Sequence, residues 1–519
     1  MSEVILIRPK PAPLEVLYRE SRPSAGLLYV AGPLVQHDFN VVIIDQTVEE
    51  NWEERLVGEI NEKTLCIGIT CMTGYMIING IEIAKLVRKY SKCPIVWGGV
   101  HPSLEPDTTI DSKYVDVIVL GEGEETFLEL VNAFKKKESL ENINGIIYKR
   151  NGKVCKNDYR KPYDLNNLPS LPIHLINMDY YRNHSKLYSF FRFKNPMALS
   201  IETSRGCTHR CAYCVLANKN YRQTSRSKWR GMSAVKLSDI VEEINKKYGI
   251  KAFTFIDDNF FVDIDRVKEF LGEIEKRNLH IEWFADIRMD TILKNGDKAF
   301  LKRLENSGLR SLGIGIESGS NRILEYIRKG ESRETYIKAN KMLATTSIVP
   351  LYGFMQGLPN EKRDDVAETF TLIADLVMEN PNSCIMLSKL LPNPNTPILE
   401  ECRKLGFAPP KKLEDWAHVM DTGWSQGPAI WMDKEAVKLI MSLFYYRYLL
   451  SRVRDIPNRE PILEMILKVA TRFMLYRLKK KRYYFIQFEK MFYNFVMIPS
   501  VNSFLHKIFK LIFPRGLYQ

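Results

Sequence analysis

The sequence of 519 residues predicts an α/β protein with a doubly wound parallel sheet, then a second strand–helix series, then a basic helical region at the C-terminal end. Three observations predict this order. Short apolar segments alternate with amphipathic ones at the start of the chain, a second alternation begins near residue 196, and nearly all of the net charge of +13 lies at the end. We expect the regions to span 1–140, 141–195, 196–400 and 401–519, the second of them a linker.

The first region is predicted to be Rossmann-like. Apolar strands such as those in 2–9 and 65–72 alternate with amphipathic stretches such as 79–91. This pattern is typical of a parallel sheet with helices on both faces, in which ligands bind where the strands end. The strand ends are rich in Gly, Thr and Ser, so a large flat ligand can approach the backbone. No Gly-x-Gly-x-x-Gly follows the first strand, which argues against a dinucleotide.

Residues 141–195 are polar and contain several prolines, and they show the weak periodicity of a linker packed between domains. In the region after it, six or more strand–helix units predict a full or partial barrel through right-handed crossovers. The chemistry of such a barrel lies at the C-terminal ends of its strands. We expect its strands within 197–204, 251–261, 281–290, 310–320, 349–361 and 383–397.

Three cysteines lie close together in SRGCTHRCAYC, residues 204–214, where the first barrel strand ends. A disulfide framework needs an even number of cysteines in a secreted chain, and a structural zinc needs four ligands, commonly as two separated pairs. Thiolates of Cys207, Cys211 and Cys214 can instead hold three irons of a [4Fe-4S] cluster and leave the fourth iron open for chemistry. The alternative is a zinc site completed by His209 or by a distant ligand.

The remaining six of the nine cysteines are not paired by spacing, and we expect them to be small buried side chains. The chain does not begin with a basic segment followed by an apolar signal core, and no run of 18 or more apolar residues predicts an ordinary transmembrane helix. These features favour a reducing, cytoplasmic setting.

Two stretches together, GVHPSLEPDTTIDSKYVDVIVLGEGEETFLELV at 99–131 and ETSRGCTHRCAYC at 202–214, resemble the cobalamin-binding radical S-adenosylmethionine enzymes, over roughly residues 1–400. The resemblance implies that the first domain carries cobalamin against its strand ends. The sequence lacks the Asp-x-His-x-x-Gly signature that supplies a cobalt ligand in other cobalamin proteins, so we expect His101 in the pocket but not on cobalt. The residues implied to contact cobalamin are Thr70, Cys71, Met72, Thr73, Gly98, Gly99, His101, Gly121 and Glu122.

The same resemblance implies binding roles for residues at the ends of the barrel strands. It implies that the amino and carboxylate groups of S-adenosylmethionine bind the open iron, with Asp257 and Asp258 facing the amino group and Arg288 near the carboxylate. Tyr213 is implied to lie along the adenine. The residues implied at the nucleoside and its ribose hydroxyls are Gly313, Gly315, Glu317 and Ser318. Structural alternatives are a helix cap for Asp258 and an internal ion pair for Arg288.

The cofactors implied are thus a [4Fe-4S] cluster, S-adenosylmethionine and cobalamin, and the most economical reaction is radical C-methylation of an unactivated carbon. The alternative keeps the cofactors but performs a rearrangement or oxidative cyclisation without methyl transfer. An RNA methylthiotransferase would need another cysteine triplet, and Cys66, Cys71 and Cys93 are too scattered for one. A corrinoid-sensing module would not use the cysteine loop. We expect a hydrophobic small molecule or lipid as substrate and a ferredoxin or flavodoxin as reductant.

The C-terminal region carries the charge: residues 434–519 hold 17 Lys and Arg against 5 Asp and Glu, and the preceding residues hold 58 against 57. Phe and Tyr accompany a basic run at 479–482, a combination that suits the headgroup layer of an anionic membrane. One expectation is therefore a peripheral contact with the inner membrane face. The other is a helical cap over the barrel with solvated charges. No RNA-binding motif accompanies the charge, so we expect no nucleic-acid partner.

Overall fold

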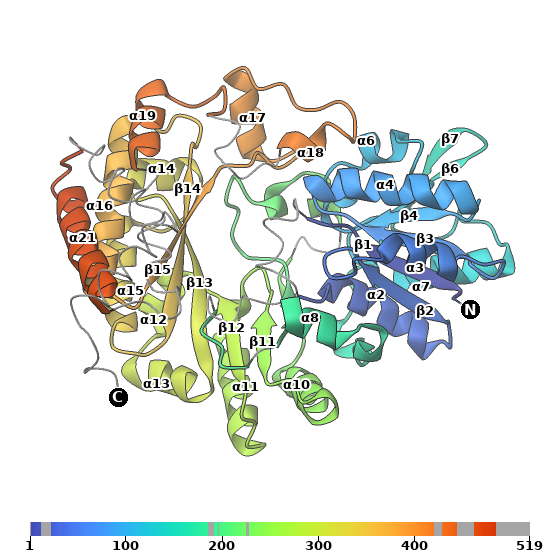
Figure 1. The fold of residues 1–519 in the computed structure, drawn as a ribbon, viewed down its shortest axis with the longest axis horizontal. Coiled ribbons are helices and arrows are strands. Elements are labelled where there is room, and N and C mark those ends of the chain that lie inside the picture. Colours follow the sequence, from blue (N-terminus) through green and yellow to red (C-terminus); the bar gives the residue numbers. More distant parts are fainter. Residues whose placement is uncertain are drawn as a thin grey trace, which may run out of the picture.

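The computed structural model describes residues 2–11, 22–184, 191–195, 197–224, 228–419, 428–443 and 461–483. These residues form two α/β domains side by side, with a C-terminal region that runs back from the second domain over the first (Figure 1). The α/β class and the order of the two sheets agree with the sequence prediction. The aromatic and basic segment beyond residue 483 lies outside the described residues.

The first sheet has the strand order β2-β1-β3-β4-β5-β6-β7, and its first five strands are parallel. Alternate residues of β1 point to opposite faces: Val4 and Leu6 pack with helices α2 and α7, and Ile5 and Ile7 pack with α3 and α4. Both faces are covered, and for this reason the strands are apolar throughout. The strands are β1 (Val4–Arg8), β2 (Val41–Asp45), β3 (Cys66–Thr70), β4 (Ile95–Gly98) and β5 (Val117–Val119). The helices are α2 (Ala25–Gln36), α3 (Trp52–Glu59), α4 (Tyr75–Tyr90), α5 (Val100–Leu104), α6 (Pro106–Asp111) and α7 (Glu124–Lys136).

The predicted linker is in part a continuation of this sheet. Strands β6 (Ile146–Arg150) and β7 (Lys153–Lys156) form an antiparallel hairpin, and β6 pairs with β5. The first domain thus extends past the predicted boundary at residue 140. The hairpin escaped the sequence analysis because β7 is a mostly exposed edge strand, which needs no apolar pattern.

The second sheet has six parallel strands in the order β15-β14-β13-β12-β11-β8, so neighbours in sequence are neighbours in space and the barrel is partial. Its strands are β8 (Ala198–Ile201), β11 (Ala252–Phe255), β12 (Glu282–Asp286), β13 (Leu309–Glu317), β14 (Val349–Gln356) and β15 (Cys384–Lys389). Its helices are α10 (Ala234–Tyr248), α11 (Ile264–Lys276), α12 (Met289–Asn295), α13 (Lys298–Asn306), α14 (Asn321–Tyr326), α15 (Arg333–Leu343) and α16 (Arg363–Glu379).

Capping side chains define where several of these helices begin. The side chains of Ser233, Asp263, Asp297 and Ser332 accept hydrogen bonds from backbone N–H groups in the first turns of α10, α11, α13 and α15. Each such cap stabilises a helix by about 1 kcal/mol, because it satisfies an N–H that has no partner inside the helix. Because these helices follow the strands along the chain, a fixed helix start also fixes the loop that leaves the C-terminal end of the preceding strand.

The C-terminal region covers both domains. From α17 (Pro397–Lys404) the chain crosses to the first domain, where α18 (Trp416–Val419) packs on α4 (Figure 1). Helices α19 (Lys434–Leu443) and α21 (Pro461–Lys479) pack on α16 at the far side of the barrel. Helices α19 and α21 therefore form a helical cap over the barrel, one of the two expectations. In the part of the chain that the structure describes, no helix is both long and apolar enough to cross a membrane.

Candidate active site at the junction of the two domains

A cavity of about 340 Å³ opens where the two domains meet. The carboxyl ends of β3, β4 and β5 and the start of α2 form most of its wall, and Glu202, Arg205 and Ile256 complete it from the barrel. Strand order reverses between β1 and β3, and ligands of doubly wound sheets bind at such a reversal. A Cβ at Gly26 would meet no atom within 4 Å, and one at Gly98 would meet only Val119, so the backbone is bare on this side.

Six of the nine residues predicted to contact cobalamin line this cavity: Thr70, Met72, Gly98, Gly99, Gly121 and Glu122. The other three, Cys71, Thr73 and His101, do not line it. Backbone hydrogen bonds explain the difference, because Cys71 N–H donates to Gly98 C=O at 2.8 Å and His101 N–H donates to Cys71 C=O at 3.0 Å. These bonds join the two loops and leave the side chains of Cys71 and His101 buried.

His101 is fully buried beneath the C-terminal region. Its Nδ1 lies 2.9 Å from the hydroxyl of Thr73, and its ring centroid lies 6.2 Å from that of Trp416 on α18. Nε2 of His101 has no hydrogen-bond partner among the described residues. Burial lowers the pKa of His101 to about 3, so the ring is neutral at pH 7. The side chain of His101 therefore lies in the core between Thr73 and Trp416 of α18 and not in the wall of the cavity, which corrects its predicted place in the cobalamin pocket.

The cysteine loop follows β8 and lies against an apolar patch. Cys207 and Cys214 pack beside Leu104 of the first domain and beside Leu216 and Tyr221. Burial raises the pKa of Cys207 and raises that of Cys214 to about 12, and the nearby Asp258 carboxylate acts in the same direction. Thiolates in such a place need a bound cation to be stable, as iron would provide. Among the described residues, no group of three or more His, Cys, Asp or Glu is arranged to hold one metal ion.

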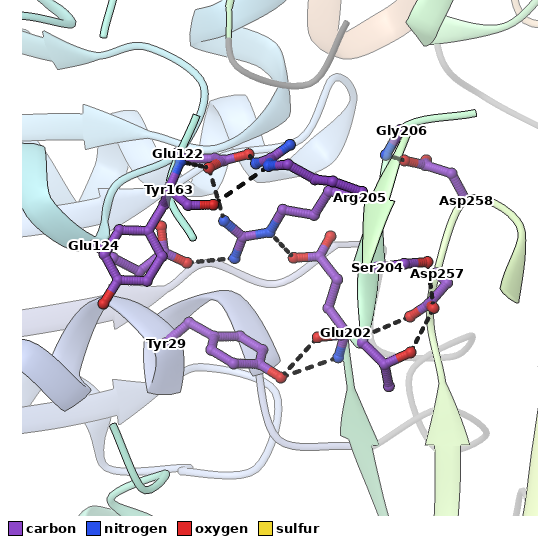
Figure 2. Close-up of polar contacts among 12 residues, drawn as sticks. Tyr29, Glu122, Glu124, Tyr163, Glu202, Ser204, Arg205, Gly206, Asp257 and Asp258 are labelled. Atoms are coloured by element: carbon purple, nitrogen blue, oxygen red, sulfur yellow. Dashed lines mark hydrogen bonds and ion pairs between the residues drawn. The ribbon is translucent and has the colours of Figure 1, made fainter. Parts of the chain in front are cut away.

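Two adjacent carboxylates after β11 bind the residues that lead into the cysteine loop. Asp257 accepts hydrogen bonds from the N–H and hydroxyl of Thr203, both at 2.6 Å, and from the Ser204 hydroxyl at 2.5 Å. Asp258 accepts from Gly206 N–H at 2.8 Å (Figure 2). Asp257 is buried, and desolvation raises its pKa to about 6. The role predicted for Asp257, facing an amino group, is therefore corrected: its carboxylate fixes the backbone that leads to the cysteines.

Glu317, at the end of β13, is the centre of a second group of contacts. The Tyr213 hydroxyl donates to Glu317 Oε1 at 2.9 Å, and Lys329 Nζ lies 3.5 Å from the same oxygen. A Cβ at Gly315 would lie 2.4 Å from Glu317 Oε1, so only glycine leaves room for this carboxylate. Glu317 itself has a left-handed φ of 68°, which is costly for a residue with a side chain. The structure thus brings Tyr213, Gly315 and Glu317, which were each predicted to lie at the nucleoside, into one group with Lys329.

The other residues predicted to bind the nucleoside or the carboxylate, Arg288, Gly313 and Ser318, have three different surroundings. Arg288 is buried and donates to Lys329 C=O at 2.8 Å, with Asp290 at 3.2 Å, which agrees with the alternative of an internal ion pair. Gly313 has the Asp286 carboxylate against it, because a Cβ there would lie 1.9 Å from Oδ1. Ser318 lies away from the loop, with its hydroxyl 3.2 Å from that of Thr369 on α16.

A cluster of buried charges joins the two domains beside the cavity. Arg205 is 2% exposed; its Nε donates to Glu202 Oε2 at 2.8 Å, its Nη1 lies 3.2 Å from Glu122 Oε2, and its Nη2 donates to Glu124 (Figure 2). Arg230, which pairs with Arg205 across strands β9 (Ser204–Arg205) and β10 (Arg230–Gly231), also donates to Glu122. We refer to Arg205, Arg230, Glu122, Glu124 and Glu202 as the Arg205 centre.

Most residues of this centre were not predicted from the sequence. Glu122 was predicted to contact cobalamin, but both of its oxygens are already engaged by the two arginines, and Oε2 also accepts from Tyr163 N–H at 3.0 Å. The available signals were the arginine directly before Gly206 and Cys207, and the three glutamates of GEGEE. Neither signal says that the charges pair with each other, because they come from different domains.

The fold and the three-thiol loop together define an iron–sulfur enzyme whose barrel faces the ligand cavity of a second cofactor domain. Comparisons with known proteins agree. The model of the radical SAM superfamily matches residues 201–373, and that of the B12 binding domain matches residues 20–131. The chain therefore belongs to the cobalamin-dependent radical S-adenosylmethionine enzymes, and its cofactors are a [4Fe-4S] cluster, S-adenosylmethionine and cobalamin.

Three similar proteins illustrate the range of this class. The uncharacterized methyltransferase PH0819 of Pyrococcus horikoshii is 29% identical over 375 residues, 71% of this chain and 77% of that protein. The anaerobic magnesium-protoporphyrin IX monomethyl ester cyclase of Synechocystis is 27% identical over 361 residues, 68% of each. The structure of OxsB, a cobalamin-dependent S-adenosylmethionine radical enzyme with aqua-cobalamin and S-adenosylmethionine bound, matches with a TM-score of 0.67 at 19% identity, over 98% of this chain and 75% of that one.

The residues present fit these cofactors. Three free thiols on one loop, one buried and two partly buried, suit the cluster, and the bare glycine backbone at the end of β4 suits a broad flat ligand. Glu317 Oε1 is engaged by Tyr213 and Lys329, which leaves Oε2 as an acceptor for hydroxyl groups of a nucleoside.

Proposed function

We propose that the enzyme methylates an unactivated carbon of a hydrophobic small molecule or lipid. The observation that carries the proposal is the arrangement of the junction, where the cavity of the B12-binding domain and the approach to the cysteine loop share the residues Glu202 and Arg205. A methyl carrier and a radical source placed on either side of one space act on one substrate. The similarity to a methyltransferase of P. horikoshii supports the same reaction.

The bound cofactors would supply a 5′-deoxyadenosyl radical that removes a hydrogen atom, and a methyl group that replaces it. The side chains of the protein bind and orient these cofactors. Cys207, Cys211 and Cys214 hold the cluster, and Asp258 fixes the backbone N–H directly before them. Glu317, oriented by Tyr213 and Lys329, would receive the ribose hydroxyls.

Apolar side chains at the junction support a hydrophobic substrate. Met72 of the first domain is 57% exposed and Ile256 of the barrel is 41% exposed, and both line the cavity. Large apolar side chains left exposed beside a cofactor cavity gain free energy when an apolar ligand covers them. The charged side chains that line the cavity, Glu122, Glu124, Glu202 and Arg205, form ion pairs within the Arg205 centre.

A second candidate is a rearrangement or oxidative cyclisation without methyl transfer. The specific observation in its favour is the similarity to the cyclase of Synechocystis, which covers 68% of this chain. Either reaction needs an external electron, and we propose a ferredoxin or flavodoxin as its donor.

Product analysis distinguishes the two candidates. The reconstituted enzyme, with reductant and S-adenosylmethionine deuterated in its methyl group, is incubated with a lipid-rich extract of the cells that encode it. The proposal predicts S-adenosylhomocysteine and 5′-deoxyadenosine in about equal amounts, and one extract compound that gains a deuterated methyl group. Deoxyadenosine without S-adenosylhomocysteine and without a labelled compound would favour the second candidate.

A further inference from the structure

The segment 202–206 connects β8 to the first cysteine, and every one of its residues is held by a side chain of another element. Asp257 and Asp258 hold Thr203, Ser204 and Gly206 from within the barrel. The Arg266 guanidinium adds a bond to the Thr203 hydroxyl at 2.5 Å. These contacts fix the segment to the barrel.

The other two residues of the segment are held by the first domain. The Tyr29 hydroxyl, on α2, donates to Glu202 C=O at 3.0 Å and accepts from Glu202 N–H at 3.2 Å. The Arg205 guanidinium pairs with Glu122 and Glu124, and lies 5.8 Å from the centre of the Tyr29 ring (Figure 2). All five of these residues line the cofactor cavity: Tyr29, Glu122, Glu124, Glu202 and Arg205.

The cavity wall and the start of the cysteine loop are therefore one continuous structure, only two residues from Cys207. We propose that Arg205 is a positioning residue that sets the separation and orientation of the B12-binding domain relative to the cysteine loop. Radical abstraction and methyl delivery at one carbon need both cofactors in register, and a misplacement of about 1 Å can cost about 100-fold in rate.

The chemistry of arginine fits this role. A guanidinium has a planar fork of donors, and here three different nitrogens face three different carboxylates, two from one domain and one from the other. A lysine keeps the charge but concentrates it at one nitrogen, which cannot meet all three carboxylates in the same directions. Arg205→Lys therefore separates the geometry of the contact from its charge.

Residue-resolved hydrogen–deuterium exchange of the cofactor-free protein tests the positioning. In Arg205→Lys, the Glu202 amide, bonded to Tyr29 across the junction, should exchange about tenfold faster, because the junction opens more often. The Gly206 amide, bonded to Asp258 within the barrel, should change by less than about twofold. In the reconstituted variant, the yield of methylated product per deoxyadenosine should fall about 10- to 100-fold.

Arg277→Lys is the matched control, because Arg277 also pairs with three carboxylates, Asp239, Glu242 and Glu273, but all of them lie within the barrel. The inference is wrong if Arg205→Lys leaves exchange at Glu202 unchanged, or if Arg277→Lys accelerates it equally. Should Arg205→Lys fail to fold, Glu124→Gln decides in its place: it weakens the pairing that joins Arg205 to the first domain and leaves both hydrogen bonds between Glu202 and Tyr29 in place, so unchanged exchange at Glu202 would again refute the inference. Only the product ratio rests on the proposed methylation, so the exchange result stands or fails independently of it.

Discussion

The Arg205 centre and the end of α21 both gather positive charge, but in opposite settings. Arg205 is 2% exposed and surrounded by carboxylates at the domain junction. Lys479, Lys480, Lys481 and Arg482 are all exposed, and α21, which precedes most of them, also exposes the apolar side chains of Val469, Phe473 and Tyr476. The centre contributes little to the net charge because its members nearly cancel, whereas the α21 end belongs to the region that carries almost all of it.

This comparison distinguishes buried charged groups, which stabilise the structure through their ion pairs, from exposed charged groups, which contact solvent. A buried pair is only weakly screened, so removal of one partner leaves an uncompensated charge at a high cost. An exposed charge is screened within about 8 to 10 Å by physiological salt and contributes little to folding. Net charge therefore points to surface partners, and it says nothing about the charges that position the cofactors.

The largest effect is expected from removing the buried cation. Arg205→Met leaves Glu122, Glu124 and Glu202 without their shared partner, and the free energy of unfolding should fall by about 3 to 5 kcal/mol. Arg277→Met, whose side chain is 17% exposed, should cost about 1 kcal/mol or less. Urea denaturation followed by fluorescence measures both, and equal losses in the two variants would abolish the distinction between the two settings.

Next in size is the pH dependence from a buried neutral group. His101 has a pKa of about 3 when folded, below its ordinary value of 6.5, so below pH 6.5 the unfolded chain takes up a proton that the folded chain does not. As the pH is lowered below 6.5, the free energy of unfolding should therefore decrease by about 1.4 kcal/mol per pH unit, or about 3 kcal/mol between pH 6.5 and pH 4. Thermal denaturation across this range should show a shallower decline for His101→Gln than for wild type. The exposed His280→Gln should follow the wild-type curve; a His101→Gln curve parallel to wild type would show that the ring is protonated in the fold.

A smaller effect is expected at the partly buried Tyr213. Tyr213→Phe removes the hydrogen bond that orients Glu317, at a cost of about 1 kcal/mol, so S-adenosylmethionine should bind about fivefold more weakly. Calorimetric titration of the reconstituted, oxidised enzyme measures the dissociation constant. Tyr326→Phe, whose hydroxyl donates to Glu401 on α17, is the control and should bind as wild type does. Unchanged affinity in Tyr213→Phe would remove Glu317 from the proposed nucleoside site.

The smallest effect on folding is expected at the end of α21, where we propose a contact with anionic membrane. Changing Lys479, Lys480, Lys481 and Arg482 to Gln should alter the free energy of unfolding by less than about 1 kcal/mol in total. The same variant should sediment less with anionic vesicles, to which each basic residue near the surface contributes about 1 kcal/mol. Wild-type binding should weaken as salt rises and be absent with neutral vesicles. Equal sedimentation of variant and wild type would leave the helical cap as the only role of this surface.

How far the sequence predicts this protein depends on whether a feature is local. The parallel strands and the cysteine loop were predictable, because a strand covered on both faces is apolar throughout and three closely spaced thiols suit few other sites. The pairing of β6 with β7 was not, because β7 is an edge strand and need not be apolar. Asp257 and Asp258 both follow β11, and sequence alone does not say which faces the loop backbone. The pairing of Arg205 with Glu124 spans 81 residues and two domains, so it follows from neither local pattern.

The central claim is that one chain holds a cluster on the three cysteines and cobalamin in a separate domain. Iron and cobalt analysis of anaerobically reconstituted protein tests it most directly, with wild type beside a variant in which Cys207, Cys211 and Cys214 are all Ala. Wild type should contain about four irons and about one cobalt per chain, and the variant should lose the iron and keep the cobalt. Full iron in the triple variant, or no cobalt in wild type, would contradict the account.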